Sequence, residues 1–274
     1  MNNSQYEERY CLFLDILGFQ SHIEETVSPN AKSKHPMTFV RLKSALEEIS
    51  KGVHYREGII SDNGKTLVSS REVTQFSDSV IISYKKSEAT GGSGVSSMLM
   101  DVHRLQLQLV NKGILLRGAI TSGLLYHDKE FVFGPALNDA VTLERLANYP
   151  RVILDSEILN ETGLKSSKND DNSRTISSMI SEDLDGLFYV DYFDVHPDDF
   201  DGDWNDISYY LEKLRELIKG LSNKKNLSIK VKHSWLRTKF NIIAKPFKKN
   251  KFTKLGYHDV PKEDVQIFSG IKPF

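Results

Sequence analysis

Cysteine is almost missing from this chain of 274 residues, in which Cys11 is the only one. No intrachain disulfide can form, and a cysteine within an apolar run favours a buried packing role in a reducing compartment. An excess of charge is missing too, since 36 Lys and Arg stand against 37 Asp and Glu; dedicated nucleic-acid binders are usually strongly basic. The first apolar run is shorter than the roughly 20 residues that span a bilayer, and no basic segment precedes it. We therefore expect a cytoplasmic protein without a membrane partner.

One carboxylate interrupts that first apolar run. Residues 10–17 read YCLFLDIL, which predicts a buried strand with Asp15 near its carboxyl end, and Gly18 follows as a turn residue. An ionised carboxylate in an apolar setting costs several kcal/mol or more unless something pairs with it or binds it. Asp15 therefore needs a partner.

The rest of the chain alternates helical and extended patterns. We predict strands at 114–127, 151–159 and 186–195, a hairpin at 71–84 and a polar loop at 165–182. Helices are predicted at 37–51, from about Met98 to Gly113, from Pro135 onward and over 207–221, and a basic, aromatic segment at 228–240 is expected to be helical as well. The body of the chain therefore mixes helices and strands and the tail is helical, and the family resemblance described below assigns the α+β class.

A second carboxylate, Asp78, lies at the apex of the predicted hairpin. If the hairpin neighbours the first strand, Asp78 and Asp15 converge, and two close carboxylates repel each other unless a cation lies between them. Mg²⁺ and Mn²⁺ prefer such oxygen ligands, with water and phosphate completing the set. This pairing points to phosphoryl-transfer chemistry on a nucleotide. Without it, Asp15 is equally well explained as a carboxylate capped by backbone N–H groups, and Asp78 as a turn residue.

Four segments, in order, resemble the class III nucleotidyl cyclases, the adenylate and guanylate cyclase catalytic fold. They are FLDILGF (13–19), FSDSV (76–80), RGAITSG (117–123) and FGPALNDAVTLERL (133–146), and the resemblance covers roughly residues 8–195. It implies a palm-type, ferredoxin-like domain over 1–195, with a mixed, largely antiparallel sheet and helices on one face. An acidic loop and a C-terminal helical extension would follow over 196–274. It further implies a head-to-tail homodimer with its sites at the interface.

Site residues follow from the same resemblance. It makes Asp15, Asp78 and the backbone carbonyl of Ile16 the ligands of two Mn²⁺ or Mg²⁺ ions per site, and it places Gly18 and Phe19 in the turn under the triphosphate. Arg117 matches the arginine that contacts phosphates, and Asn138 the helix asparagine that orients the ribose. Where the family has an arginine four residues after that asparagine, this chain has Thr142, so Arg145 is the candidate substitute. Plainer alternatives are a solvated strand arginine for Arg117 and a helix-start residue for Asn138.

The residues that read a purine in this family are replaced. Thr74 stands where a lysine is usual, and Phe131 where an acidic residue is usual; neither offers the charged donor or acceptor that discriminates adenine. The LRGAITSG form of the strand at 116–123, together with the blocks at 182–193 and 232–241, resembles the bacterial Pycsar cyclases. These make cyclic UMP or cyclic CMP as an alarm against phage and signal to a cyclic-nucleotide-sensing effector. We expect UTP or CTP as substrate, with the uridylate type favoured.

Two other classes of function stay open. The replaced residues Thr142, Thr74 and Phe131 also suit a degenerate cyclase domain that binds a nucleotide or a partner protein without turnover. The basic, aromatic tail at 230–252 has the composition of a nucleic-acid-binding segment, although an amphipathic helix with its lysines in water explains it more simply. We expect no nucleic-acid partner, and a solvated loop rather than a calcium site at 194–206.

Overall fold

A computed structural model describes residues 5–27, 35–51, 59–60, 66–67, 69–87, 93–166, 174–200, 202, 204–248, 265, 268 and 270–274. The chain forms two compact units, Met1–Gly163 and Leu164–Phe274, which are described in turn. The predicted boundary at 195/196, between a cyclase domain and its extension, stays a prediction.

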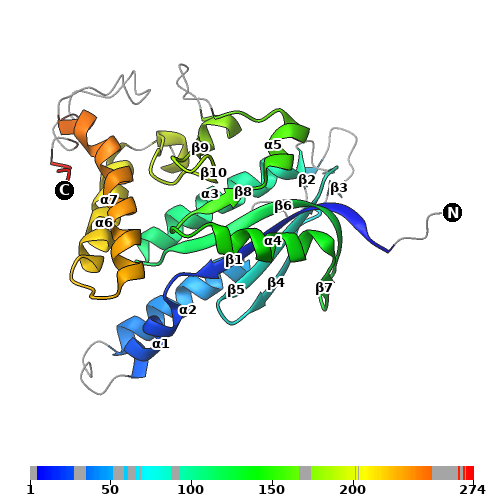
Figure 1. The fold of residues 1–274 in the computed structure, drawn as a ribbon, viewed down its shortest axis with the longest axis horizontal. Coiled ribbons are helices and arrows are strands. Elements are labelled where there is room, and N and C mark those ends of the chain that lie inside the picture. Colours follow the sequence, from blue (N-terminus) through cyan, green and yellow to red (C-terminus); the bar gives the residue numbers. More distant parts are fainter. Residues whose placement is uncertain are drawn as a thin grey trace. The chain divides into compact units, whose positions relative to one another are not determined.

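A mixed sheet organises the first unit (Figure 1). Its strands run in the order β4-β5-β1-β6-β8, and all neighbours are antiparallel except β6 and β8. Their bounds are β1 Glu7–Ile16, β4 Glu72–Phe76, β5 Ser79–Lys85, β6 Leu116–His127 and β8 Val152–Leu154. A short strand, β7 Val132–Phe133, pairs with the end of β6. The central place of β1 explains why its sequence is an almost continuous apolar run.

Beside this sheet, a small separate hairpin joins β2 Ile59–Ile60 to β3 Thr66–Leu67. It falls in the stretch 55–70, which lies between the two carboxylates in the sequence. The other residues of that stretch, apart from 69–70, lie outside the described part of the chain.

Five helices belong to the described part of the first unit: α1 Phe19–Val27, α2 His35–Lys51, α3 Gly94–Asn111, α4 Pro135–Leu146 and α5 Ser156–Thr162. The α3 helix packs on the face of the sheet that carries Tyr10, since the hydroxyl of Tyr84, opposite Tyr10 on β5, donates to Asp101 of α3. The α4 helix packs on the other face, where Ala136 and Ala140 form a core cluster with Cys11. Successive side chains of a strand point to opposite faces. The expectation that the helices lie on one face is therefore wrong, although the α+β class is confirmed.

The second unit is built around two long helices. Its elements are a 3-10 turn η2 Ile176–Met179, β9 Ile180–Glu182, β10 Phe188–Val190, a 3-10 turn η3 Pro197–Phe200, α6 Trp204–Leu221 and α7 Leu227–Lys248. The strands β9 and β10 pair antiparallel. The predicted apolar stripe of α6 is buried at Ile207, Leu211 and Leu214, and α7 buries Leu236 and Phe240. This confirms the helical tail and the amphipathic character of its basic segment.

A tryptophan anchors α7 to the turn between β9 and β10. The indole Nε1 of Trp235 donates to Asp183 Oδ2 at 2.7 Å, and Lys239 Nζ lies 3.0 Å from Asp183 Oδ1. Burial would raise the pKa of Asp183, but the bonds from Lys239 and Trp235 outweigh it, and the pKa is lowered. Lys239 is therefore an ion-pair partner rather than a solvated lysine.

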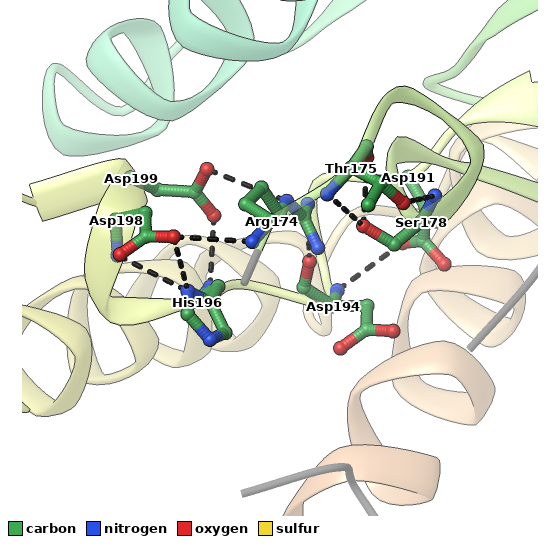
Figure 2. Close-up of polar contacts among 8 residues, drawn as sticks. All are labelled: Arg174, Thr175, Ser178, Asp191, Asp194, His196, Asp198 and Asp199. Carbon is green, nitrogen blue, oxygen red and sulfur yellow. Dashed lines mark hydrogen bonds and ion pairs between the residues drawn. The ribbon is translucent and has the colours of Figure 1, made fainter. Parts of the chain in front are cut away.

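The acidic loop is less solvated than its sequence suggests (Figure 2). Arg174 donates to the carbonyl of Asp194 at 2.7 Å, and its Nε lies 3.4 Å from Asp199 Oδ1 with both side chains almost fully buried. The Asp199 carboxylate also accepts the backbone N–H of His196 at 2.8 Å. Asp198, by contrast, is half exposed. The prediction of a solvated loop is thus wrong for Asp199, because Arg174 compensates its charge.

Three predicted elements differ from those observed. The strand predicted at 151–159 ends at Leu154, because Asp155 caps α5 by accepting the N–H of Glu157. The strand predicted at 186–195 shortens to Phe188–Val190, and the predicted loop at 165–182 contains η2 and β9, with 167–173 outside the described residues. Among the helices that the structure describes, none is both long and apolar enough to cross a bilayer.

Candidate functional site

The two carboxylates singled out in the sequence lie together. Asp15 occupies the end of β1, opposite Ser79 on β5, and Asp78 lies in the two-residue turn that joins β4 to β5. The backbone N–H of Ile16 donates to the carbonyl of Asp78 at 3.2 Å, which ties the turn to the end of the strand. The side chain of Asp78 is within hydrogen-bonding reach of Asp15. The register of the sheet thus brings together two acids that are far apart in sequence.

Their proximity changes the acidity of Asp15. Burial, followed by the charge of Asp78, raises the pKa of Asp15 from 3.8 to about 6, against a smaller lowering by Arg117. The Asp15 side chain is 24% exposed, so the carboxyl is partly screened from water and open on one side. A carboxylate that ionises with difficulty in the free protein is one that a cation would stabilise.

Arg117 connects this pair to a third acid. It lies opposite Asp15 on β6, its Nη2 is 3.3 Å from Asp15 Oδ2, and its Nε forms an ion pair with Glu144 of α4. Glu144 is 6% exposed and also raises the pKa of Asp15. When all are ionised, three carboxylates face one guanidinium, and the site carries an excess of negative charge.

Glu144 is the residue that sequence reasoning missed. Ala136, Ala140 and Glu144 follow one another at intervals of four on α4, so Glu144 continues the stripe that packs on the sheet. A charged residue at the buried position of an amphipathic helix was the available signal. In the structure it pairs with Arg117, which is expected to contact phosphates and instead contacts two carboxylates of its own chain.

Two other predicted residues lie directly after the strand that carries Asp15. Gly18 adopts φ +75°, where a side chain would be strained, and it completes the turn before α1. Phe19 is the first residue of α1, rather than part of the turn. The first N–H groups of a helix have no partner within the helix and favour anions. The start of α1 thus brings backbone donors close in sequence to Asp15.

A separate group contains the residues expected to read the base. Thr74 on β4 bonds to the imidazole of His127, at the end of β6. Phe131 lies in the turn that follows β6, held by its N–H to Asp128 Oδ1 at 2.7 Å, with its ring 59% exposed. In the sheet, Thr74 pairs with Ile81, and Ile81 pairs with Phe13, which lies two residues before Asp15 on β1. The spacing of residues along a strand and between neighbouring strands then places the Cα atoms of Thr74 and Asp15 about 12 Å apart. One copy of the chain therefore does not bring these two groups into contact.

The residues expected on α4 form a third group. Asn138 and Arg145 are exposed, as is Thr142, whose hydroxyl donates to the carbonyl of Asn138 at 2.8 Å. Asn138 precedes Glu144 by six residues, which corresponds to about 9 Å along the helix and a different side of it. Asn138 thus lies on the solvent side of the helix, whereas Glu144 meets Arg117. Arg145, next to Glu144, is also turned to solvent.

The described residues do not gather three or more His, Cys, Asp or Glu side chains in an arrangement that could hold a metal ion. The oxygen donors available at the pair are therefore the two carboxylates and neighbouring main-chain carbonyls. Such a set fits a hard divalent cation whose remaining ligands are phosphate and water. The Asp15–Asp78 pair, whose charge Arg117 neutralises only in part, is the observation that favours this fit.

Comparison with known proteins gives a limited result. No protein-family model matches the chain, and no curated protein matches it. Among solved structures, the chain is similar to the adenylyl cyclase CyaB from P. aeruginosa, with 17% sequence identity and a TM-score of 0.39. The match covers 67% of this chain and 93% of that one. A likeness of this degree does not define a family, so the functional conclusion depends on the geometry of the site.

Proposed function

We propose that the chain is a metal-dependent nucleotidyl cyclase of the class III type, which converts UTP or CTP into the 3′,5′-cyclic nucleotide and pyrophosphate. The observation that carries this proposal is the convergence of Asp15 and Asp78 at the end of the central strand, with more negative charge than Arg117 neutralises. Nucleotide chemistry needs a site that attracts divalent cations together with their bound triphosphate.

In this proposal, Asp15, Asp78 and the carbonyl of Ile16 hold two Mg²⁺ or Mn²⁺ ions. The ions supply Lewis acidity, which favours ionisation of the ribose 3′-hydroxyl and neutralises charge on the triphosphate. The first N–H groups of α1, after Gly18, donate hydrogen bonds to phosphate oxygens. Arg117 exchanges one of its carboxylate partners for a phosphate and stabilises the charge that builds up there.

The reaction forms one bond and breaks one. The 3′-oxygen bonds to the α-phosphorus, the bond from that phosphorus to the bridging oxygen of the β-phosphate breaks, and pyrophosphate leaves with the electron pair. The hydroxyl proton passes to solvent. Asn138 orients the ribose, and Arg145 supplies the positive charge that Thr142 lacks.

A second copy of the chain completes the site. Asn138 and Arg145 are exposed on the solvent side of α4, and Thr74 lies about 12 Å from Asp15, so one copy presents the two halves of a site separately. A head-to-tail homodimer joins the carboxylates of one copy to the α4 residues and base-reading residues of the other. The cyclic product then acts as an antiphage alarm that a cyclic-nucleotide-sensing effector detects.

The test is incubation of the purified chain with each of the four nucleoside triphosphates and Mn²⁺, followed by chromatography of the products. We expect cyclic UMP or cyclic CMP, and we expect Asp78→Ala to lower its rate on the order of a thousandfold. The control is Asp206→Asn, which removes an exposed carboxylate on α6 and should leave the rate unchanged. Absence of cyclic product from every triphosphate would refute the proposal.

One observation favours a second candidate, a cyclase-like protein that binds nucleotides without turnover. Thr142 stands where the family has an arginine, and its hydroxyl is used in a bond to its own helix. Such a protein would be stabilised by a nucleotide, measured as a rise in melting temperature, and would release no pyrophosphate.

A further inference from the structure

A chain of buried hydrogen bonds ends at Thr74, on the same face of the sheet as Asp15. Arg9 Nε donates to Ser83 Oγ at 2.9 Å, Ser83 Oγ lies 2.8 Å from His127 Nδ1, and His127 Nε2 lies 3.0 Å from Thr74 Oγ1. The side chains of Arg9, Ser83 and His127 are buried, whereas Thr74 is partly exposed. The path therefore leads from the interior of the sheet to the surface.

The direction of each bond follows from the donors. A guanidinium only donates, so Ser83 accepts from Arg9 and keeps a single hydroxyl hydrogen. Ser83 is fully buried, and among the described residues its side chain bonds to Arg9 and His127. The Ser83 hydroxyl must donate its hydrogen to Nδ1 of His127. If Nδ1 donated to Ser83 instead, the hydroxyl hydrogen of Ser83 would be buried without an acceptor. Nδ1 is thus the unprotonated nitrogen of the ring.

The other ring nitrogen then carries the hydrogen. Burial, with a further contribution from the charge of Arg9, lowers the pKa of His127 from 6.5 to about 4, so the imidazole is neutral at physiological pH. A neutral imidazole with an accepting Nδ1 has its hydrogen on Nε2 and donates it to Thr74 Oγ1. Within the described residues this is the hydrogen bond that the Thr74 hydroxyl makes, which leaves its own hydrogen free.

We propose that Arg9, Ser83 and His127 fix Thr74 as a hydrogen-bond donor toward the nucleotide base, and that this donor selects uracil over cytosine. The inference rests on the proposed function, in which Thr74 contacts the base. Uracil presents the O4 carbonyl, an acceptor, where cytosine presents the N4 amino group, a donor. Pairing with O4 uses the free hydrogen of the Thr74 hydroxyl, whereas pairing with the N4 amino group could use only the second lone pair of the Thr74 oxygen and would leave that hydrogen without an acceptor on the base. His127 is the positioning residue, and Thr74 makes the contact.

The hydrogen-bond chain is tested without any nucleotide. In long-range ¹⁵N–¹H spectra of the full chain at pH 7, we expect His127 to show a protonated Nε2 and an unprotonated Nδ1. Its signal is assigned by its loss in His127→Phe. A protonated Nδ1 would overturn the proposal, whether or not the protein is an enzyme.

The specificity is tested by the ratio of kcat/KM for UTP to that for CTP. We expect Thr74→Val, which keeps the shape and removes the donor, to lower this ratio about tenfold, mainly through KM. Thr74→Ser restores the donor and should restore the ratio. His127→Phe should lower the ratio as Thr74→Val does, although it leaves Thr74 in place. A ratio unchanged in Thr74→Val refutes the selection of uracil.

Failure of the proposed function and failure of the hydrogen-bond chain give different experimental results. A wild-type chain that forms no cyclic product refutes the proposed function, and the selection of a base with it. The tautomer of His127 in the same sample still confirms or refutes the hydrogen-bond chain. A preference for CTP combined with a protonated Nε2 would show that the donor is built as described but does not choose the base.

Discussion

Replacing Asp15 by asparagine should make the protein more stable while it removes the proposed cyclase activity. Asp15 holds its proton more tightly in the folded chain, where its pKa is about 6, than at its ordinary value of 3.8. As the pH rises through this interval, the unfolded chain loses the proton first, so the free energy of unfolding falls and stays lower above pH 6. The aspartate thus destabilises the metal-free protein at neutral pH.

The size of the expected stabilisation follows from the difference between the two pKa values of Asp15. The difference between 3.8 and about 6 corresponds to about 3 kcal/mol. The carboxyl is 24% exposed, and solvent screening reduces the expected gain in Asp15→Asn to about 1–2 kcal/mol at pH 7.5. Arg117 keeps its pairing with Glu144 in the variant, so no buried charge is left without a partner.

Urea unfolding in EDTA at several pH values between 3.5 and 7.5 measures the effect. We expect wild type and Asp15→Asn to be equally stable near pH 3.5 and to diverge as the pH rises. Added Mn²⁺ should stabilise the wild type and leave the variant unchanged. The control Asp206→Asn should follow the wild type throughout. A variant less stable than wild type at pH 7.5, or a difference independent of pH, would refute the reasoning.

Two further predictions concern packing, each read from urea midpoints. Trp235→Phe leaves the Asp183 oxygen without the indole donor and should destabilise by about 1–2 kcal/mol at pH 7. Because the pKa of Asp183 is lowered in the folded chain, the loss should shrink as the pH falls below the ordinary value of 3.8, and a loss that does not depend on pH contradicts the assignment. Gly118→Ala places a Cβ 2.5 Å from the carbonyl oxygen of Phe13 and should destabilise the protein by about 2–3 kcal/mol. The control Gly220→Ala has open space around it and should stabilise by about 0.5 kcal/mol. Equal effects of the two substitutions would show that the backbone around residue 118 moves to accommodate the Cβ.

The elements that could be predicted from the sequence are those whose local residue pattern matches their place in the folded sheet. The apolar run of β1, the hairpin with Asp78 at its turn and the Gly134–Pro135 start of α4 are all observed. Each has a strong local signal: a continuous apolar segment, a short polar apex between β-branched runs, and a proline at the first helical position.

Elements without such a signal were missed. The α1 helix was missed although Phe19, Ile23 and Val27 recur at intervals of four; the helix has nine residues and buries none of them, so its stripe is short. The α5 helix was interpreted as the end of a strand, although Asp155 followed by Glu157 is a helix-start pattern.

The charge balance of the site depends on the tertiary structure. The pairing of Arg117 with Glu144 joins a strand to a helix, and the spacing of these residues in the chain does not reveal it. The same holds for the buried path from Arg9 to Thr74, whose members lie on four different strands.

The β4–β5 hairpin has a consequence for cooperation between subunits. Thr74 and Asp78 lie four residues apart on this one stiff hairpin, yet in a head-to-tail pair they serve different active sites. If nucleotide binding at one site rotates the hairpin slightly, the rotation would therefore also move the residue that serves the other site. For the proposed head-to-tail pair we therefore expect alternating turnover, in which one site reacts while the other does not.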